Sequence, residues 1–317
     1  MGNLWHVKNW FRTGHNISWA LNFHTLFGFL QLSAPNKFFY SQSQKKHKFI
    51  LNYIKTELPD VIEKYRHMNE NPDAGISHRI WILWWQGEDS APPLVKACID
   101  STRKNAGSAE VTVITKDNYK EYIDIPSYIL DKQKKGWISF AQLSDIIRYM
   151  LLSNHGGLWL DATVYTAQPI PSACFDYYFF SQHTKPEKNS AWVQNNAYHG
   201  FIVGSRQNAK LACFMRDMFL SYWQTHDTLV DYLMVDYLIM TACIEFPDIR
   251  QEINSLPYSS ERLYDLVHLL NRPFNEAEFD KLRSECIFSK LDWHKKYRET
   301  AEKQKTYYYM LTKQTKK

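Results

Sequence analysis

Short apolar runs alternate with helical patterns through the middle of the chain. Residues 79–85 (RIWILWW) are rich in strand-forming side chains and stop at a polar turn, and residues 111–115 form a second run of this kind. A helical pattern follows each run, at 92–103 and at 117–122. The alternation predicts an open, mainly parallel α/β sheet flanked by helices, with ligands at the carboxyl ends of the strands.

The two ends of the chain differ from this α/β middle. The N-terminal pattern is helical until the turn residues 71–75 (NPDAG), and beyond residue 200 helical patterns return, most clearly at 209–222 and 229–245. We expect three parts: a helical N-terminal extension over residues 1–75, an α/β domain over residues 76–295, and a basic C-terminal helix or tail over residues 296–317.

Charge is distributed unevenly along the chain, although the net charge is only +5. Residues 1–56 contain seven Lys or Arg and no acid, and residues 290–317 contain nine Lys or Arg against three acids. Large aromatics accompany the N-terminal cations: Trp5, Trp10, Phe11, Trp19, Phe23, Phe27 and Phe29. This mixture predicts a helical subdomain packed on the main body, contact with an anionic membrane surface, or both. No nucleic-acid-binding motif accompanies it, so nucleic acid is not an expected partner.

The cysteine pattern and the apolar segments bear on location. Five cysteines are far apart in the sequence and have no CxxC spacing, which favours neither a disulfide framework nor a zinc site. The N-terminus lacks the apolar core of a signal peptide, and no uninterrupted apolar stretch reaches membrane-spanning length. We expect a cytoplasmic protein, peripheral on the inner face of the cell membrane where its basic ends make contact.

Two charges interrupt the apolar helical segment 144–152 (SDIIRYMLL). Asp145 and Arg148 are three residues apart and therefore share one face of the helix. An ion pair within the helix is the ordinary interpretation of this spacing. The apolar surroundings favour a functional role over a simple ion pair, because a buried charge is costly unless it is paired or used. The Asp145 carboxylate can accept hydrogen bonds from sugar hydroxyls, and the Arg148 guanidinium can donate two hydrogen bonds to a phosphate.

A glycine pair and a short strand pattern follow this helix. Gly156 and Gly157 are suited to a left-handed cap and a close backbone approach, and residues 158–160 (LWL) predict a buried strand. Asp161 would then lie near the carboxyl end of the strand, within reach of a sugar hydroxyl or a divalent cation. The order of D-x-x-R, Gly-Gly, aromatic and Asp is far more specific than its parts.

This combination, together with RIWILWWQG upstream, resembles the glycosyltransferases of the capsular polysaccharide synthesis type. These are relatives of the retaining enzymes that carry a D-x-D motif and of the large clostridial glucosylating toxins. The likeness covers roughly residues 78–293. It implies a GT-A type, Rossmann-like fold and a retaining transfer of a hexose from a nucleotide sugar, expected to be a UDP-sugar. The implied acceptor is a glycan of a surface polysaccharide, expected to be lipid-linked.

The resemblance also assigns site residues. Asp145, Arg148 and Asp161 would hold the donor sugar and its diphosphate. Further donor-binding residues are expected at the following positions: Trp84, Trp85, Gln86, Gly87, Ser144, Trp159 and Lys290. For each Trp a place in the core is the alternative, and for Lys290 a solvated position. Asn196 or His199 could face the anomeric carbon, and Asp236 could orient the acceptor.

A metal ion is part of the same expectation. Asp161 matches the first acid of D-x-D, but Thr163 replaces the second, and a threonine oxygen is a weak ligand for a hard cation. Mn²⁺ or Mg²⁺ would be held by Asp161, Thr163 and Ser289 together with the donor diphosphate. Without the second acid, the chain could instead be a catalytically weak or inactive nucleotide-sugar-binding scaffold. The dipeptide His226-Asp227 also suggests a metal phosphohydrolase, but no partner histidines lie at a suitable helical spacing from it, so this function is not expected.

Overall fold

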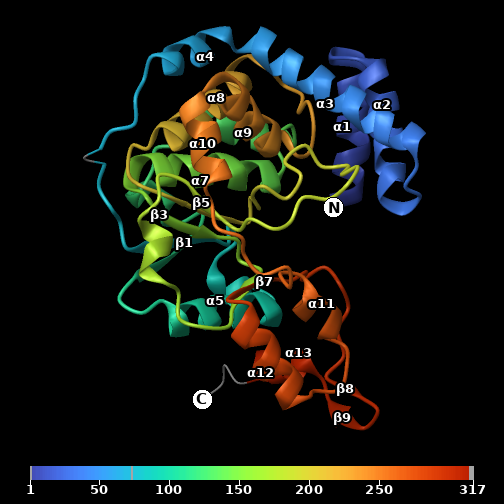
Figure 1. The fold of residues 1–317 in the computed structure, drawn as a ribbon, viewed down its shortest axis with the longest axis vertical. Coiled ribbons are helices and arrows are strands. Elements are labelled where there is room, and N and C mark those ends of the chain that lie inside the picture. The colour runs from blue at the N-terminus through green and yellow to red at the C-terminus, as the bar shows by residue number, and fades with distance from the viewer. Residues whose placement is uncertain (1, 73, 314–317) are drawn as a thin grey trace.

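The computed structural model describes residues 2–72 and 74–313 (Figure 1). Among these residues five strands form a central sheet in the order β2-β1-β3-β6-β5. The strands are β1 (Arg79–Leu83), β2 (Glu110–Ile114), β3 (Gly157–Leu160), β5 (Phe180–Ser181) and β6 (Ile202–Ser205). β1 pairs in parallel with β2 and β3, whereas β6 runs antiparallel to both β3 and β5. The prediction of a mainly parallel, mixed α/β sheet is confirmed.

Alternating side chains of the strands bury the two faces of this sheet in different cores. Trp81 of β1 and Trp159 of β3 join a core with helices α7 (Phe140–His155), α8 (Lys210–Thr225) and α9 (Met234–Glu245). Their neighbours Ile80 and Leu158 pack instead with α5 (Pro93–Asn105). Figure 1 shows α7 and α8 on one side of the strands and α5 on the other. Trp81 lies opposite Trp159, so the carboxyl ends of β1 and β3 lie side by side.

Four helices precede the sheet: α1 (Gly2–Asn16), α2 (Trp19–Ser33), α3 (Lys37–Glu57) and α4 (Pro59–Arg66). α2 packs on α3, and α3 packs on α9 of the main body (Figure 1). This packing agrees with the predicted helical extension, within which the side chain of Phe29 lies outside the described residues. In residues 2–72 and 74–313, every helix is too short or too polar to cross a bilayer.

The remaining elements cover the sheet and build the C-terminal region. The helices are α6 (Ser127–Lys134), α10 (Pro247–Asn254), α11 (Asp265–Leu269), α12 (Glu276–Glu285) and α13 (Tyr307–Lys313). The strands are β4 (Val164–Thr166), β7 (Phe288–Lys290), β8 (Thr300–Ala301) and β9 (Gln304–Lys305), and the 3₁₀ turns are η1 (Glu88–Ser90), η2 (Tyr119–Glu121) and η3 (Ser172–Phe175). β4 pairs antiparallel with β7 and sets Val164 opposite Lys290, which brings the C-terminal region to the end of β3.

Some predicted elements differ from those observed. The helix expected over 229–245 begins only at Met234, because Asp231 turns the chain by accepting a hydrogen bond from Leu233 N at 2.9 Å. The helix expected over 117–122 is the short 3₁₀ turn η2. Beyond residue 295 the described chain forms the β8–β9 hairpin and α13, whose Tyr307 is fully buried. The division of the chain into three domains stays a prediction.

Candidate active site

The turn between α7 and β3 positions the two halves of the site. Ser139 caps α7 by accepting a hydrogen bond from Gln142 N at 3.1 Å. Gly156 and Gly157 end the helix with φ angles of +65° and +99°, a region that favours glycine. A Cβ on Gly156 would also lie 2.6 Å from the backbone nitrogen of Gln207. The chain can therefore reverse direction tightly between α7 and β3, and Asp161, at the end of β3, lies beside Asp145 and Arg148 of α7.

Four charged side chains form one connected network at this edge of the sheet. Arg148 donates from Nη1 to Asp145 Oδ1 at 2.7 Å and from Nη2 to Asp161 Oδ1 at 3.0 Å. Lys290 Nζ donates to Asp161 Oδ2 at 2.6 Å. Trp159 Nε1 also donates to Asp161 Oδ1, at 2.9 Å. The structure thus brings together the predicted residues Asp145, Arg148, Asp161, Trp159 and Lys290.

The electrostatics of the two carboxylates differ. Burial raises the pKa of Asp145 to about 6 against the opposing charge of Arg148. Burial alone would also raise the pKa of Asp161, but the charges of Lys290 and Arg148 hold it below its usual value. Asp161 is therefore ionised at neutral pH and below, whereas Asp145 takes up a proton in mildly acidic solution.

Unsatisfied polar atoms lie next to the network. Among the described residues, Gln142 Oε1, Arg148 Nε and the Tyr149 hydroxyl are buried and have no hydrogen-bond partner. Such atoms are costly and are uncommon away from functional sites. Sequence reasoning missed Gln142, whose Nε2 donates to Asp145 Oδ2 at 2.9 Å. The signal was its position three residues before Asp145, one turn away on the same face.

Aromatic rings form a wall beside Lys290, and sequence reasoning missed two of them. The ammonium of Lys290 lies 5.1 Å from the ring centroid of Phe201, and that ring packs against Tyr264 at 6.0 Å. The ring of His199 packs against both Phe201, at 5.4 Å, and Tyr264, at 6.2 Å, and its Nε2 lies 3.2 Å from Thr184 Oγ1. Burial lowers the pKa of His199 to about 4, so the imidazole is neutral at physiological pH.

The residues expected to bind the nucleobase divide between the two faces of the sheet. Trp84 follows β1 and forms an edge-to-face pair with Trp293 at 5.5 Å, whereas Trp85 packs on Tyr119 and the α7 core. The ring of Trp159 is in the core, 1% exposed, and it contacts the site in two ways: Nε1 donates to Asp161, and the Arg148 guanidinium lies 4.9 Å from the ring centroid. Gly87 has a φ of +93° at the turn after β1.

The other predicted residues lie at varying places around the network. Gln86 is exposed, and Ser144 is half-buried beside Asp145. Asn196 donates to the carbonyl of Lys185 at 3.0 Å, in the loop that leads to β6. Asp236 is buried in the first turn of α9, where burial, together with the charge of Asp145, raises its pKa to about 7. Asp236 therefore interacts with the network, although it lies on a different helix.

Of the residues expected to bind a metal, Ser289 does not converge with Asp161, and Thr163 is half-buried, with its backbone carbonyl accepting a hydrogen bond from Leu291 N at 2.8 Å. Both oxygens of Asp161 already accept hydrogen bonds, and two of the donors are the cations Arg148 and Lys290. Ser289 precedes Lys290 on β7, so its side chain points to the opposite face, toward the Cys286 thiol, where it is 1% exposed. In the described part of the chain, no group of three His, Cys, Asp or Glu side chains could hold a metal ion. These donors do not fit a divalent cation, whose charge the two neighbouring cations would repel.

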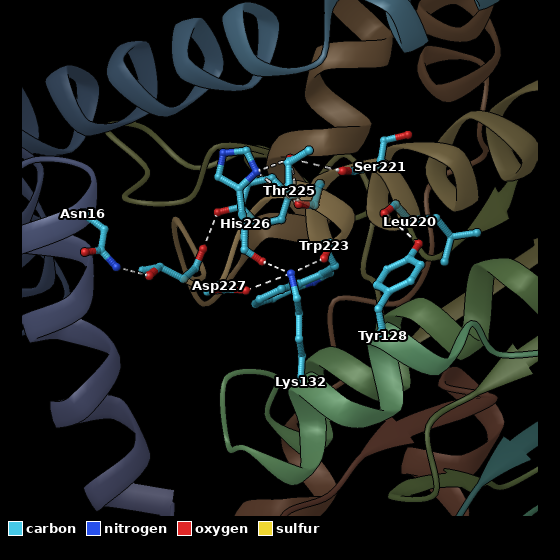
Figure 2. A network of polar contacts seen from close by, with 11 residues as sticks. Asn16, Tyr128, Lys132, Leu220, Ser221, Trp223, Thr225, His226 and Asp227 are labelled. Carbon is cyan, nitrogen blue, oxygen red and sulfur yellow. Dashed lines mark hydrogen bonds and ion pairs between the residues drawn. The ribbon is translucent and has the colours of Figure 1, made fainter.

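The pair His226 and Asp227 belongs to a different network, shown in Figure 2. Lys132 on α6 points its ammonium at the backbone carbonyls of Trp223 and His226, at 2.5 and 2.8 Å, and at Asp227 Oδ1, at 2.8 Å. His226 Nε2 lies 3.3 Å from Glu57, and its ring stacks on Tyr222. These contacts hold α6 against the C-terminal end of α8, and the His226 ring is engaged by Glu57 and Tyr222.

The fold and the site define an α/β protein with a cluster of two acids and two cations at the carboxyl edge of its sheet. The chain belongs to the family of capsular polysaccharide synthesis proteins, which it matches over residues 34–311. This membership confirms the resemblance seen in residues 144–165 and agrees with the expected class, a glycosyltransferase. Among solved structures the chain is similar to one described as PaToxG glycosyltransferase, at 14% identity and a TM-score of 0.40, with 78% of this chain and 99% of that chain covered. No curated protein matches.

Proposed function

We propose that this chain is a retaining glycosyltransferase of the GT-A type that transfers a hexose from a nucleotide sugar, a UDP-sugar, to a glycan of a surface polysaccharide. The observation that carries the proposal is the network of Asp145, Arg148, Asp161 and Lys290, in which two cations meet two carboxylates at the edge of the sheet. Family membership supports the same class of reaction.

Each member of the network has a task in such a transfer. The bond from the anomeric carbon to the diphosphate oxygen breaks, so positive charge develops on the sugar and negative charge on the leaving group. Arg148 and Lys290 would stabilise the departing diphosphate. Asp145 and Asp161 would accept hydrogen bonds from sugar hydroxyls and tolerate the positive ring. The leaving phosphate can take the proton of the acceptor hydroxyl on the same face, so retention needs no separate base.

The base of the donor would bind beyond the end of β1. Trp84 and Trp293 offer an aromatic corner there, and the β1–β3 register brings this end of the sheet next to Asp161. Trp84 Nε1 is buried without a hydrogen-bond partner in residues 2–72 and 74–313, so a base carbonyl could accept from it once the side chain shifts. Trp85, on the opposite face, would serve the core.

The charge of the diphosphate would be neutralised by side chains and not by a resident metal. The two cations within 3.0 Å of Asp161 already occupy the place that a divalent ion would need. We therefore propose that activity survives chelation by EDTA. A strict requirement for added Mn²⁺ or Mg²⁺ would contradict this part of the proposal.

The N-terminal helices would hold the enzyme at an anionic membrane surface. Apolar side chains are unusually exposed on them: Phe11, Trp19, Phe23, Leu26 and Phe38. Exposed cations accompany them at Lys8, Lys37, Lys45 and Lys48. A triple Phe11→Ser, Trp19→Ser, Phe23→Ser variant should lose most cosedimentation with anionic vesicles, whereas Tyr258→Ser, an equally exposed aromatic elsewhere, should not. Equal binding of both variants would sink the membrane proposal.

Donor turnover tests the proposed reaction. The full chain is incubated with a panel of UDP-sugars, with EDTA or Mn²⁺, and release of UDP is measured for wild type and Asp161→Ala. Asp131→Ala is the matched control, because Asp131 is exposed and pairs only loosely with Lys134, at 3.5 Å. We expect release by wild type and the control and not by Asp161→Ala. Binding of a donor with no release under any condition would favour a scaffold, which the replacement of the second D-x-D acid by Thr163 also suggests.

A further inference from the structure

A cavity of about 540 Å³ lies between the N-terminal helices and two loops of the main body. Its wall draws residues from α1, α2 and α3, from the loop at 191–193 and from the loop at 230–233. Much of the lining is apolar and includes Trp10, Leu32, Trp192, Val193, Val230 and Leu233. A space of this size is typical of sites for small molecules or for one lipid chain.

One wall of the cavity includes Tyr237 of α9, which directly follows Asp236, the residue whose pKa the charge of Asp145 raises. The loop 230–233 leads directly into α9, and the carbonyl of Leu233 accepts a hydrogen bond from Asp236 N at 3.0 Å. Tyr232 lines the cavity, and its pKa is raised first by desolvation and then by the charges of Asp145 and Asp161. A molecule lying along this wall would therefore place its polar end near the acids of the network.

One end of the cavity adjoins the exposed apolar surface of the N-terminal helices. Trp10 and Leu32 line the cavity and are also 37% and 47% exposed. Trp10 packs edge-to-face on Phe11 and Trp19, both of which are more than half exposed. The cavity is thus continuous with a surface that offers apolar rings beside cations.

An ion pair and a hydrogen bond hold the walls of the cavity together. Lys46 of α3 forms an ion pair with Asp231 at 2.7 Å, and His47 Nδ1 lies 2.9 Å from the Tyr237 hydroxyl. The first contact joins α3 to the loop 230–233, and the second joins α3 to α9, the helix that carries Asp236. Among the described residues of the polar lining, His47 Nε2 is buried without a hydrogen-bond partner and could accept or donate to an occupant, whereas Lys46, Asp231 and His47 Nδ1 are paired within the protein, so the apolar lining does most of the selection.

We propose that this cavity binds the apolar chain of an amphipathic, lipid-linked saccharide acceptor. The proposal rests on the proposed function, since it assigns the occupant as the acceptor. The chain would enter from the exposed aromatic surface, and the attached sugar would lie near Tyr232 and Asp236. Continuity with a cationic, aromatic surface at one end and the position of Tyr237 next to Asp236 in another wall argue for one amphipathic occupant over a second copy of the chain.

Binding of alkyl maltosides below their micelle concentrations tests the proposal without any donor. We expect the full chain to bind dodecyl maltoside saturably and not to bind maltose, and we expect the affinity to rise about fourfold per added methylene from octyl to dodecyl maltoside. Ala191→Phe, which fills the cavity, should abolish the dependence on chain length. Ala277→Phe adds the same volume at an exposed position of α12 and should leave it intact.

A second measurement guards against misfolding of the filled variant. A maltoside with a brominated alkyl chain should quench the fluorescence of the unaltered chain, and Trp192→Phe should remove more of the quenched signal than Trp293→Phe does. Equal chain-length dependence in wild type and Ala191→Phe, or quenching unaffected by Trp192→Phe, would overturn the proposal. So would a stable dimer that excludes the probe. Because no nucleotide sugar is used, a negative result with the maltosides does not argue against the proposed transfer reaction. Conversely, absence of UDP release in the turnover experiment does not argue against binding of an alkyl chain in the cavity.

Discussion

Two clusters of charged side chains in this protein differ in how their charges are satisfied. Around Lys132, one ammonium is surrounded by two backbone carbonyls and Asp227, so acceptors from the protein satisfy it (Figure 2). Around Asp161, two cations and two carboxylates contact one another, Arg148 Nε has no partner among the residues that the structure describes, and the pKa of Asp145 is raised to about 6. The first cluster satisfies backbone carbonyls at the end of α8, and the second holds charged groups that a ligand could bind.

The difference separates a structural use of charge from a chemical one. A cation that satisfies backbone carbonyls stabilises the fold and has nothing left to offer a ligand. A cluster whose members are held mainly by each other can exchange those contacts for a diphosphate and sugar hydroxyls of matching charge. Substitutions in the two clusters should therefore affect different measurements.

The largest effect is expected for Asp161→Asn. Loss of the charge removes the ion pair of Asp161 with Lys290 and one of the two ion pairs of Arg148, and should lower the rate of sugar transfer by about 100-fold or more. The fold should persist, because the amide can still accept the Trp159 hydrogen bond. Steady-state UDP release, compared with circular dichroism, measures the two effects separately. A rate within threefold of wild type would contradict the assignment of Asp161 to the donor.

Lys132→Met should show the reverse behaviour. Two buried carbonyls lose their donor, so the free energy of unfolding should fall by about 2 to 3 kcal/mol. Turnover per folded molecule should not change, since Lys132 contacts none of the proposed site residues. Urea unfolding and UDP release at 15 °C provide the two readouts. A fall in turnover without a fall in stability would mean that this cluster takes part in the chemistry.

A smaller effect is expected for Asp236→Asn, and it should depend on pH. The folded pKa of Asp236, about 7, lies above its unfolded value near 4, so the folded state binds the proton more tightly. The stabilisation from this proton is complete below pH 4 and is lost as the pH rises through 7. At pH 8 the variant should therefore be more stable than wild type, and near pH 4 the two should unfold alike. Thermal unfolding across this range measures the difference, with Asp131→Asn as a control. A difference that does not vary with pH would contradict the buried, proton-binding state of Asp236.

The site could be predicted to the extent that it is local in sequence. Asp145, Arg148 and Asp161 lie within 17 residues on one helix, turn and strand, and the glycine pair specifies that turn. Long-range partners were harder to predict. Lys290 was expected from the family resemblance, but its pairing with Asp161 depends on the β4–β7 register, and Phe201 joins it only through the tertiary fold.

Tertiary contacts also explain where the helix prediction failed. Residues 229–233 are apolar enough to continue the helical pattern, but Asp231 there pairs with Lys46 of α3 and turns the chain. Ser289 is separated from Asp161 for a similar reason, because strand alternation places Ser289 and Lys290 on opposite faces of β7. Sequence patterns describe local spacing and not which side of a paired strand faces the site.

The central claim is that Arg148 and Lys290, held by Asp161, form a diphosphate site that needs no metal. Calorimetric titration of UDP and of uridine into wild type and Lys290→Met, in EDTA, tests it most directly. We predict that wild type binds UDP, that Lys290→Met weakens UDP binding at least tenfold, and that uridine binds both proteins equally. Equal UDP affinity for the two proteins, or UDP binding that appears only when Mn²⁺ is added, would contradict the claim.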